Sequence, residues 1–311
     1  TLRATRFPIT VKTIFGFYKN NSTIWMPDNT NIFTVNQLSL ETNQIGVGEL
    51  MRFYQYACSL SYTSVTLNIS PTNHVDANLS ALIIALARKL QIERKVRVFV
   101  ELGDGKGVFF RNGLISHLQG NGNNNQYPDD RQSTIPLTAF NPDEDDNYCN
   151  YLRNQFFAHR GLDNVARSVK DALRTHYIEV FTNVGLHANT TLPVYTCGQY
   201  FPERNLLKFT LIDLGDGFLR KIQAATNGRV SDDRSAILWA TEGINSTKDV
   251  NTFGPGGTGL KELKNYCNAN NGSLHICSGT GYVNMLSNRT LEYHLPAPFP
   301  GSIISIIMRN I

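Results

Sequence analysis

The first half of the chain alternates apolar and polar positions in a pattern that predicts a strand, a helix and a second strand. An apolar, β-branched run covers residues 64–69, helical spacing covers residues 77–91, and a further strand pattern covers residues 95–101. Apolar residues at helical spacing over residues 48–60 predict another helix before the first strand. Alternating strands and helices of this kind favour an α/β fold.

The middle of the chain is polar and separates two parts. Residues 119–132 are rich in Asn and Gly and too poor in apolar groups to offset the entropy of ordering, so they predict a mobile loop. A short strand pattern over residues 134–140 follows, and then a run of four consecutive acidic residues. We therefore expect an α/β domain over residues 1–141, a linker over residues 142–147 and a second domain over residues 148–311.

The second half begins with helical patterns and then changes to strand patterns. Helical spacing covers residues 148–157 and 162–188. Further along, the patterns predict strands at residues 206–212, 273–277, 282–286 and 303–308, and helices at residues 235–241 and 260–269. Helices on one face of a mixed sheet would bury these patterns, so the expected fold class is α/β in both parts.

Composition narrows the class of protein. With 41% apolar and 17% charged residues among 311, the chain is composed like a globular protein with a sizeable core. Its longest apolar stretch, residues 79–90, is shorter than the roughly 20 residues that span a bilayer. Residues 1–10 contain no secretory apolar core. We therefore expect a cytoplasmic protein without a membrane partner.

Net charge and cysteine content say little about partners. The net charge of +4 is mild and the basic residues are scattered, which does not support a nucleic-acid partner. The five cysteines are an odd number, with no CxxC pair and no histidine at metal-ligand spacing, so we expect reduced thiols. Neither feature determines the oligomeric state, and a homodimer stays open.

The first motif with chemical potential is EVFTNVGLHA, in which Glu179, Asn183 and His187 recur every four residues. On a helix this spacing places the three polar side chains on one face. An Asn oxygen is a suitable ligand for magnesium, and a carboxylate one turn away can position or deprotonate a water molecule. A polar stripe that faces solvent is the alternative interpretation.

The second motif is LLKFTLIDLGDGFL, where an apolar strand runs into Asp213, Gly215 and Gly217. The two glycines let the backbone approach a ligand closely, and the preceding Asp can accept a hydrogen bond from an amino group. A tight turn without a ligand is the alternative, because Asp-Gly and Gly-Asp pairs commonly form turns.

The third motif is NTFGPGGTGLKELKNYC, in which Gly254, Gly256, Gly257 and Gly259 precede a predicted helix. Glycines before a helix N-terminus can present free backbone N–H groups to a phosphate. The spacing of a Walker A loop is absent, and no GxGxxG fingerprint follows the early strands. A flexible hinge without a ligand is the alternative.

In this order, the three motifs resemble the N, G1 and G2 boxes of GHKL ATPases, the family of gyrase-type topoisomerases, MutL, heat-shock chaperones, histidine kinases and anti-sigma kinases. The resemblance covers residues 148–311 and implies the α/β sandwich called the Bergerat fold, with ATP or ADP and Mg²⁺ as ligands. It extends to PGSIISIIM, which looks like the last strand of the family and has Ser302 where a Thr beside the adenine is usual.

The resemblance also implies a role for each matching residue. Asn183 would coordinate Mg²⁺, Glu179 would be the general base, and Asp213 would bind the adenine amino group. Residues 218–255 would form the ATP lid. The other nucleotide-binding positions that it implies are His187, Gly215, Gly217, Gly254, Gly256, Gly257, Thr258, Gly259, Leu260 and Ser302.

The first half resembles a STAS domain, the fold of anti-sigma-factor antagonists, through VTLNIS, HVDANLSALIIALARKL and KVRVFVEL. Regulated members carry a phosphorylated Ser in a D-S-S/T-G loop, whereas here Ala77, Asn78 and Leu79 follow Asp76. Ser80 is the nearest hydroxyl, and it is expected to be structural because it lies inside the predicted helix. The resemblance implies that a protein partner docks on this half.

These features lead to one preferred hypothesis and two alternatives. The preferred function is that of an ATP-dependent signalling or switch protein in which magnesium-ATP orders the lid and Glu179 supports slow hydrolysis or phosphoryl transfer. The alternatives are an anti-sigma-type Ser/Thr kinase that acts on a separate protein, and a non-catalytic module that binds ATP or ADP as a structural ligand. His159, the candidate phosphoacceptor upstream in the second domain, is expected to be a surface or core residue rather than a phosphoacceptor.

Overall fold

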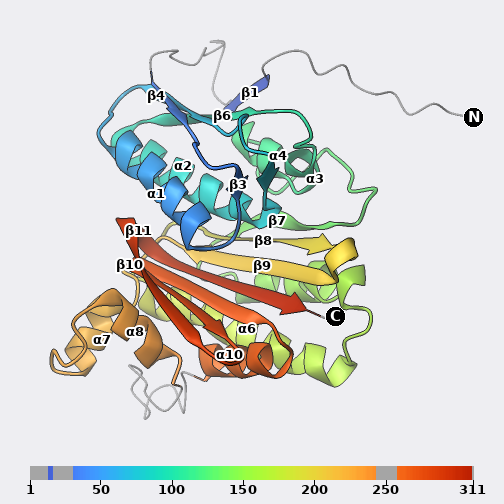
Figure 1. Ribbon diagram of the computed structural model, residues 1–311, viewed down its shortest axis with the longest axis vertical. Helices are drawn as coiled ribbons and strands as arrows, with labels where there is room; N and C mark the ends of the chain where they lie inside the picture. Colours follow the sequence, from blue (N-terminus) through green and yellow to red (C-terminus); the bar gives the residue numbers. More distant parts are fainter. Residues whose placement is uncertain (1–12, 17–30, 243–257, 310–311) are drawn as a thin grey trace, which may run out of the picture.

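The computed structural model describes residues 13–16, 31–242 and 258–309, and it shows a mixed α/β protein, as predicted. Figure 1 shows four layers: a four-stranded sheet, a pair of helices, a five-stranded sheet and a second group of helices. The four-stranded sheet and the helices beneath it come from the first half of the chain. The five-stranded sheet and the helices on its far side come from residues after about 134.

Two small sheets are built from the first half of the chain. Their strands are β1 (Thr13–Gly16), β2 (Ile32–Thr34), β3 (Ser39–Leu40), β4 (Ser64–Asn68), β5 (His74–Val75) and β6 (Arg97–Leu102). The four-stranded sheet has the order β1-β6-β4-β2, in which β2, β4 and β6 run parallel and β1 is antiparallel to β6. Strands β3 and β5 form a separate parallel pair.

Helices α1 (Gln44–Cys58) and α2 (Ser80–Arg94) form the layer between the sheets. A 3₁₀ turn precedes α2, whose residues 80–87 are all buried. One side of α2 packs on β6 and the other packs on the five-stranded sheet, which explains why its sequence is apolar almost all round. Two short helices, α3 (Val108–Arg111) and α4 (Leu114–Leu118), complete this half.

The five-stranded sheet is antiparallel throughout its described strands. These strands are β7 (Thr134–Phe140), β8 (Val194–Phe201), β9 (Leu206–Asp213), β10 (Ser273–Leu286) and β11 (Thr290–Arg309). Their order is β10-β11-β9-β8-β7. The prediction of a mixed sheet is therefore wrong for this part, because short connections join β8 to β9 and β10 to β11 and such connections make neighbouring strands antiparallel.

One face of the five-stranded sheet is covered by helices from its own half of the chain. The described α-helices after residue 141 are α5 (Asp145–Tyr151), α6 (Arg167–His187), α7 (Leu219–Ala225), α8 (Asp233–Ala240) and α10 (Gly259–Ala269). Leu207, Phe209 and Leu211 of β9 share a buried cluster with apolar residues of α6 and α10. Helix α8 packs on β10, and α7 packs on α8.

The opposite face of this sheet is also covered. The prediction of helices on one face alone would have left it open to solvent. Cys197 and Ile212 belong to one buried cluster with Leu82 and Leu86 of α2. Helix α1 packs on β11. The sheet therefore has helices on both faces, and the two halves of the chain share a hydrophobic core.

The predicted boundary at residue 141 does not separate the strands of the two larger sheets. Strand β7 lies before that boundary, yet it is the edge strand of the second sheet and pairs with β8. Within the predicted linker, helix α5 already begins at Asp145 and has Asp145 and Asp146 in its first turn. Negative charge is favourable at a helix N-terminus, so part of the acidic run starts a helix.

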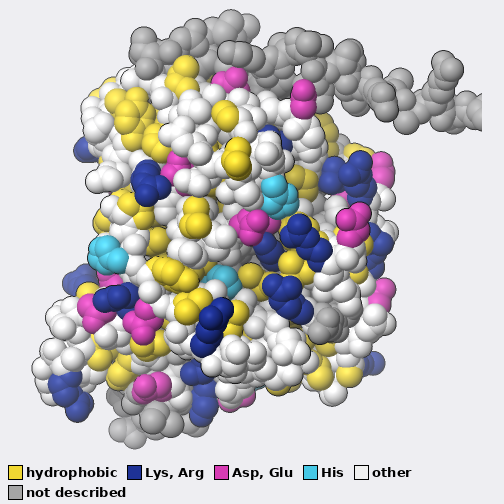
Figure 2. Space-filling view, in the orientation of Figure 1, with side chains coloured by type: hydrophobic (Ala, Val, Ile, Leu, Met, Phe, Trp, Pro, Cys, Tyr) yellow, Lys and Arg dark blue, Asp and Glu magenta, His cyan; other side chains and the backbone are white. Residues whose placement is uncertain are grey.

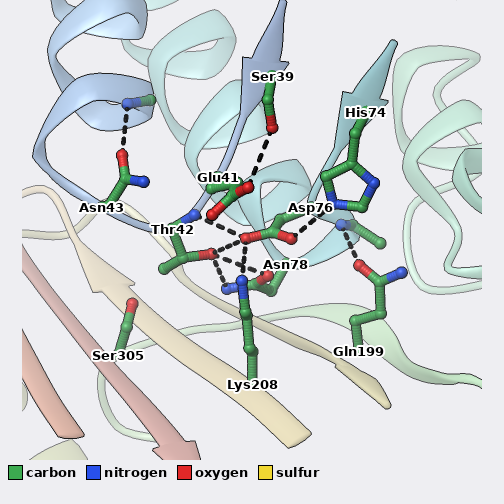
Figure 3. Close-up of polar contacts among 12 residues, drawn as sticks. Ser39, Glu41, Thr42, Asn43, His74, Asp76, Asn78, Gln199, Lys208 and Ser305 are labelled. Carbon is green, nitrogen blue, oxygen red and sulfur yellow. Dashed lines mark hydrogen bonds and ion pairs between the residues drawn. The ribbon is translucent and has the colours of Figure 1, made fainter. Parts of the chain in front are cut away.

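A buried polar network joins the two halves (Figure 3). The fully buried carboxylate of Asp76 accepts hydrogen bonds from Lys208 Nζ of β9 and from the Thr42 backbone N–H, each over 2.6 Å. His74 Nε2 lies 3.0 Å from the other carboxylate oxygen. Burial alone would raise the pKa of Asp76, but the hydrogen bond from His74 and the charge of Lys208 outweigh burial and lower that pKa to about 2.

Two strand features were not predicted. Strand β8 and the first part of β11 lack a clear pattern in the sequence, and the patterns at residues 273–277 and 282–286 belong to one strand, β10. Its pairing with β11 becomes irregular between Ser278 and Gly281, and this irregularity divides the pattern in two. Residues 119–132 form turns and loops, which confirms the predicted loop, while its mobility stays a prediction.

The surface carries a mixture of charged and polar side chains, and the cysteines are reduced, as expected from the sequence. On the face shown in Figure 2, Lys and Arg side chains are interspersed with acidic and uncharged polar side chains. All five cysteines carry free thiols. Within the described residues, no helix combines the length and apolar character needed to cross a membrane.

Candidate functional site

Glu179 and Asn183 lie one turn apart on α6. This helix is anchored by Tyr177, Val180 and Phe181, whose side chains are buried in the core on the α6 side of the sheet. The periodicity of the helix leaves Glu179 and Asn183 half-buried at the margin of that core. The alternative of a fully solvent-facing stripe therefore does not describe these two residues.

The N-terminus of α10 binds the carboxylate of Glu179. The Thr258 backbone N–H donates to Oε1 over 3.1 Å, and Thr258 Oγ1 donates to Oε2 over 3.1 Å. Thr258 is the N-cap residue of α10, so the carboxylate lies where the first N–H groups of the helix lack intrahelical acceptors. This contact joins the first predicted motif to the third.

Gly259, the first residue of α10, allows the two helices to approach closely. A Cβ atom at this position would lie 3.1 Å from the backbone oxygen of His176 and 3.2 Å from Glu179 Oε2. The next residue, Leu260, is buried in the cluster that contains Val184 of α6. The close approach places Glu179 beside the start of α10.

Asn183 has an uncommitted side-chain oxygen. Its Oδ1 atom is buried and has no hydrogen-bond partner among the described residues. A buried amide oxygen without a donor is costly, and oxygen ligands of this kind suit Mg²⁺. The described part of the chain has no cluster of three or more His, Cys, Asp or Glu residues that could hold a metal.

Asp213 is the last residue of β9 and lies directly opposite Ser302 of β11. Ser302 Oγ donates to Asp213 Oδ2, and the Gly215 backbone N–H donates to Oδ1 over 2.9 Å. The residue is 3% exposed. Burial raises the pKa of Asp213 to about 6, and the hydrogen bonds from Ser302 and Gly215 oppose that rise. At neutral pH the side chain is therefore an ionised acceptor in a largely dry position.

The loop after β9 is packed against the end of α6. The Asp216 backbone N–H donates to the Ala188 backbone oxygen over 2.8 Å, and a Cβ atom on Gly215 would lie 2.2 Å from that oxygen. Gly217 has φ +68°, and a Cβ there would lie 2.4 Å from Ser278 Oγ. Glycine is therefore required at both positions because the loop packs closely against Ala188 and Ser278, whereas the predicted approach to a ligand stays a prediction.

The structure therefore places parts of the second and third motifs against α6, at two places along the helix. Helix α6 meets α10 through Glu179 and Thr258, and meets the loop after β9 through Ala188 and Gly215. His187 is the last residue of α6. The predicted phosphate-loop glycines Gly254, Gly256 and Gly257 lie outside the described residues, as does the end of the predicted lid, whereas α7 and α8 form its first part.

Two contacts at this site were not identified from the sequence. Ser278 of β10 accepts a hydrogen bond from the Phe218 backbone N–H over 3.0 Å and lies against Gly217. A single serine in a strand gives no signal in the sequence. Ala188 follows the first motif directly, but only its backbone makes the contact, so its side-chain type gives no signal either.

The histidine and serine considered as phosphoacceptors are structural residues. Ser80 is fully buried and accepts a hydrogen bond from Asn112 Nδ2 over 2.8 Å, as its place in a helix predicted. His159 is 9% exposed, and its Nδ1 accepts from the Gly161 backbone N–H over 3.0 Å. His159 is therefore a core histidine, in agreement with its interpretation from the sequence.

No protein-family model, curated protein or solved structure matches the chain. The function therefore has to be inferred from the residues of the site and their geometry.

Proposed function

We propose that this chain is a magnesium-nucleotide-binding switch protein whose ATP site lies between α6, the end of β9 and the N-terminus of α10. The observation that carries the proposal is the convergence of these elements. Three features occur around helix α6: the buried acceptor Asp213, an Asn183 oxygen with no hydrogen-bond donor among the described residues, and the N-terminus of α10. These are the groups that an adenine, a magnesium ion and a phosphate chain require.

Each residue has a distinct task in this site. Asp213 would accept a hydrogen bond from the adenine amino group, and Gly215 and Gly217 would let the adjoining loop pack closely against Ala188 and Ser278. Asn183 would ligate Mg²⁺, and the N–H groups at the start of α10 would bind phosphate oxygens. Magnesium would neutralise phosphate charge, and Glu179 would orient a water molecule and take its proton.

The finer architecture is part of the same proposal. Residues 148–311, together with β7, would form a GHKL-like Bergerat domain, because α6 and α10 lie on the sheet face to which the Asp213 site belongs. The preceding half would be a STAS-like domain that docks a protein partner, and the protein would act in the cytoplasm. In this arrangement the five-stranded sheet separates the nucleotide site from the first half.

One observation favours a non-catalytic version of this function. Both carboxylate oxygens of Glu179 accept hydrogen bonds from Thr258, so the candidate base is already engaged. A protein with Glu179 held in this way would bind ATP or ADP as a structural ligand. The anti-sigma-type kinase that acts on a separate protein stays a prediction from the motif resemblance.

The proposed site is tested by thermal unfolding of the full chain with and without magnesium-ATP. At a ligand concentration of about 100 Kd, binding should raise the Tm of the wild-type protein by roughly 5 °C. Asp213→Asn should abolish this rise, because the amide puts a donor where the adenine amino group needs an acceptor. The matched control is Asp216→Asn in the same loop, whose carboxylate pairs with Arg220 at the surface. A full rise in Asp213→Asn would contradict the adenine assignment.

A further inference from the structure

The contact between Glu179 and the start of α10 places an anion at the position that the proposed function gives to phosphate. Thr258 supplies both donors of this contact, its backbone N–H and its hydroxyl, at 3.1 Å each. A helix N-terminus attracts negative charge, and Glu179 provides that charge from within the protein.

We propose that Glu179 sets the phosphate dependence of nucleotide binding by competing with a nucleotide phosphate for the N-terminal donors of α10. Binding of a phosphate at Thr258 and the contact between Glu179 and Thr258 then exclude one another. This inference rests on the proposed function, because it concerns the same site and the same ligand class.

A separation of the two helices would cost the close contacts between them. At Gly259 the packing is so close that a single Cβ atom would contact both the backbone oxygen of His176 and the carboxylate of Glu179 on α6. The buried side chains of Tyr177, Val180 and Phe181 hold α6 against the sheet. The carboxylate itself therefore has to rotate when a phosphate approaches, since two anions at the same donors repel each other.

Asn183 lies near enough on α6 to share a magnesium ion with the displaced Glu179 carboxylate. It lies one turn further along α6, and its buried Oδ1 has no partner among the described residues. A magnesium ion that accompanies the phosphate chain would attract both the Asn183 oxygen and the released carboxylate. Phosphate binding would thus move Glu179 from its partner on α10 toward the position from which it can act on water.

The consequence is a specific pattern across a ligand series. Adenosine uses the Asp213 side of the site and does not need the donors of Thr258, so Glu179 should not oppose its binding. ADP and ATP bring phosphates to α10 and should be opposed. Glu179→Gln keeps the side-chain length but removes its charge, so this variant should bind magnesium-ATP and magnesium-ADP roughly tenfold more tightly and adenosine unchanged.

The experiment is calorimetric titration of the full chain with adenosine, magnesium-ADP and magnesium-ATP. Wild type and Glu179→Gln are compared with Glu262→Gln, which removes a negative charge from the first turn of α10 without altering the contact to Thr258. The amide NMR signal of Thr258 gives a second measurement, because its shift on adding magnesium-ADP should resemble the shift caused by Glu179→Gln.

Each outcome has a defined meaning. Tighter binding of ADP and ATP with unchanged adenosine, in Glu179→Gln but not in Glu262→Gln, supports the competition. Equal changes for all three ligands, or equal gains in both variants, overturn it while the nucleotide site stands. If the wild-type chain binds none of the three ligands, the proposed function fails and the inference fails with it.

Discussion

Two buried aspartates associated with β9 have side-chain pKa values that are shifted in opposite directions. Asp213 ends the strand, and burial raises its pKa to about 6. Asp76 is held by Lys208 of the same strand, and there burial is outweighed by the hydrogen bond from His74 and the Lys208 charge, so its pKa falls to about 2. Asp76 is therefore a permanent anion with a structural task. Asp213 can lose its charge within the range of ordinary buffers.

This difference predicts that adenosine binding weakens as the pH is lowered through about 6, because protonated Asp213 no longer offers two acceptor oxygens to the adenine amino group. The unfolded chain keeps the carboxyl pKa near 3.9, so the native state binds the extra proton between about pH 4 and pH 6. The contribution of Asp213 to stability is thus greatest at low pH and is lost as the pH rises through 6. Titrations of adenosine at a series of pH values measure the binding effect.

The control for this titration is Ser302→Ala. The Ser302 hydroxyl donates to Asp213 and lowers the pKa of its carboxyl, so its removal should move the midpoint of the binding curve to higher pH. Adenosine is the ligand of choice because it has no phosphate that titrates in this range. A pH-independent affinity in the wild-type protein would show that Asp213 does not contact the base.

At the scale of elements, the site depends on how the end of α6 meets the loop after β9. Gly215 lies so close to Ala188 that a Cβ atom would overlap its backbone oxygen and its side chain, at 2.2 and 2.4 Å. We predict that Gly215→Ala lowers the free energy of unfolding by about 2–3 kcal/mol, because the backbone must shift to accept the methyl group. Urea denaturation measures this loss, and the displaced loop should also weaken nucleotide binding.

Gly107→Ala is the matched control, since a Cβ there meets only the end of the flexible Arg111 side chain, at 3.5 Å. Its free energy of unfolding should stay within about 0.5 kcal/mol of the wild-type value. If both variants unfold at the same urea concentration as the wild-type protein, the close contact between α6 and the loop does not exist in solution.

Most helices and strands follow from local pattern, and the exceptions have physical causes. The helical spacing before β6 was sufficient to place α2, and its nearly continuous apolar run is explained by sheets on both sides. The pairing of β7 with β8 could not be predicted, because strand partners are chosen by contacts distant in sequence. The same holds for the helices that cover the second face of the five-stranded sheet.

The residue types of the candidate site could be predicted from the sequence. The contacts between those residues could not. The four-residue spacing of Glu179 and Asn183 and the glycines after β9 were visible in the sequence. The double hydrogen bond from Thr258 to Glu179 was not, since the two residues are 79 positions apart. Nor could the sequence show that Ser302 lies opposite Asp213, which depends on the register between β9 and β11.

At the scale of the whole molecule, β9 connects the two halves of the chain. Its side chains alternate between the core beneath the sheet, which contains Phe209, and the layer above it, where Lys208 and Thr210 meet the first half. The shared core and the polar network predict that both sheets unfold in one cooperative transition. Asp213 and Lys208, on one short strand, then belong to one folding unit.

The last prediction concerns the ion pair between Asp76 and Lys208. Lys208→Met should lower the free energy of unfolding at pH 7 by about 3–5 kcal/mol, because it leaves the buried Asp76 carboxylate without its cation. The double variant Asp76→Asn/Lys208→Met should recover most of this loss, since neither charge remains buried and unpaired. Urea denaturation of the wild type, both single variants and the double variant gives the coupling energy.

The pH dependence provides an independent check on this pair. The pKa of Asp76 is lowered to about 2 in the folded protein, so its contribution to stability is present above the unfolded pKa near 4 and is lost as the pH falls toward 2. The double variant should therefore lose less stability than the wild type between pH 4 and pH 2. Identical acid profiles for the two proteins, or a single Lys208→Met variant as stable as the wild type, would show that the pair does not hold the halves together.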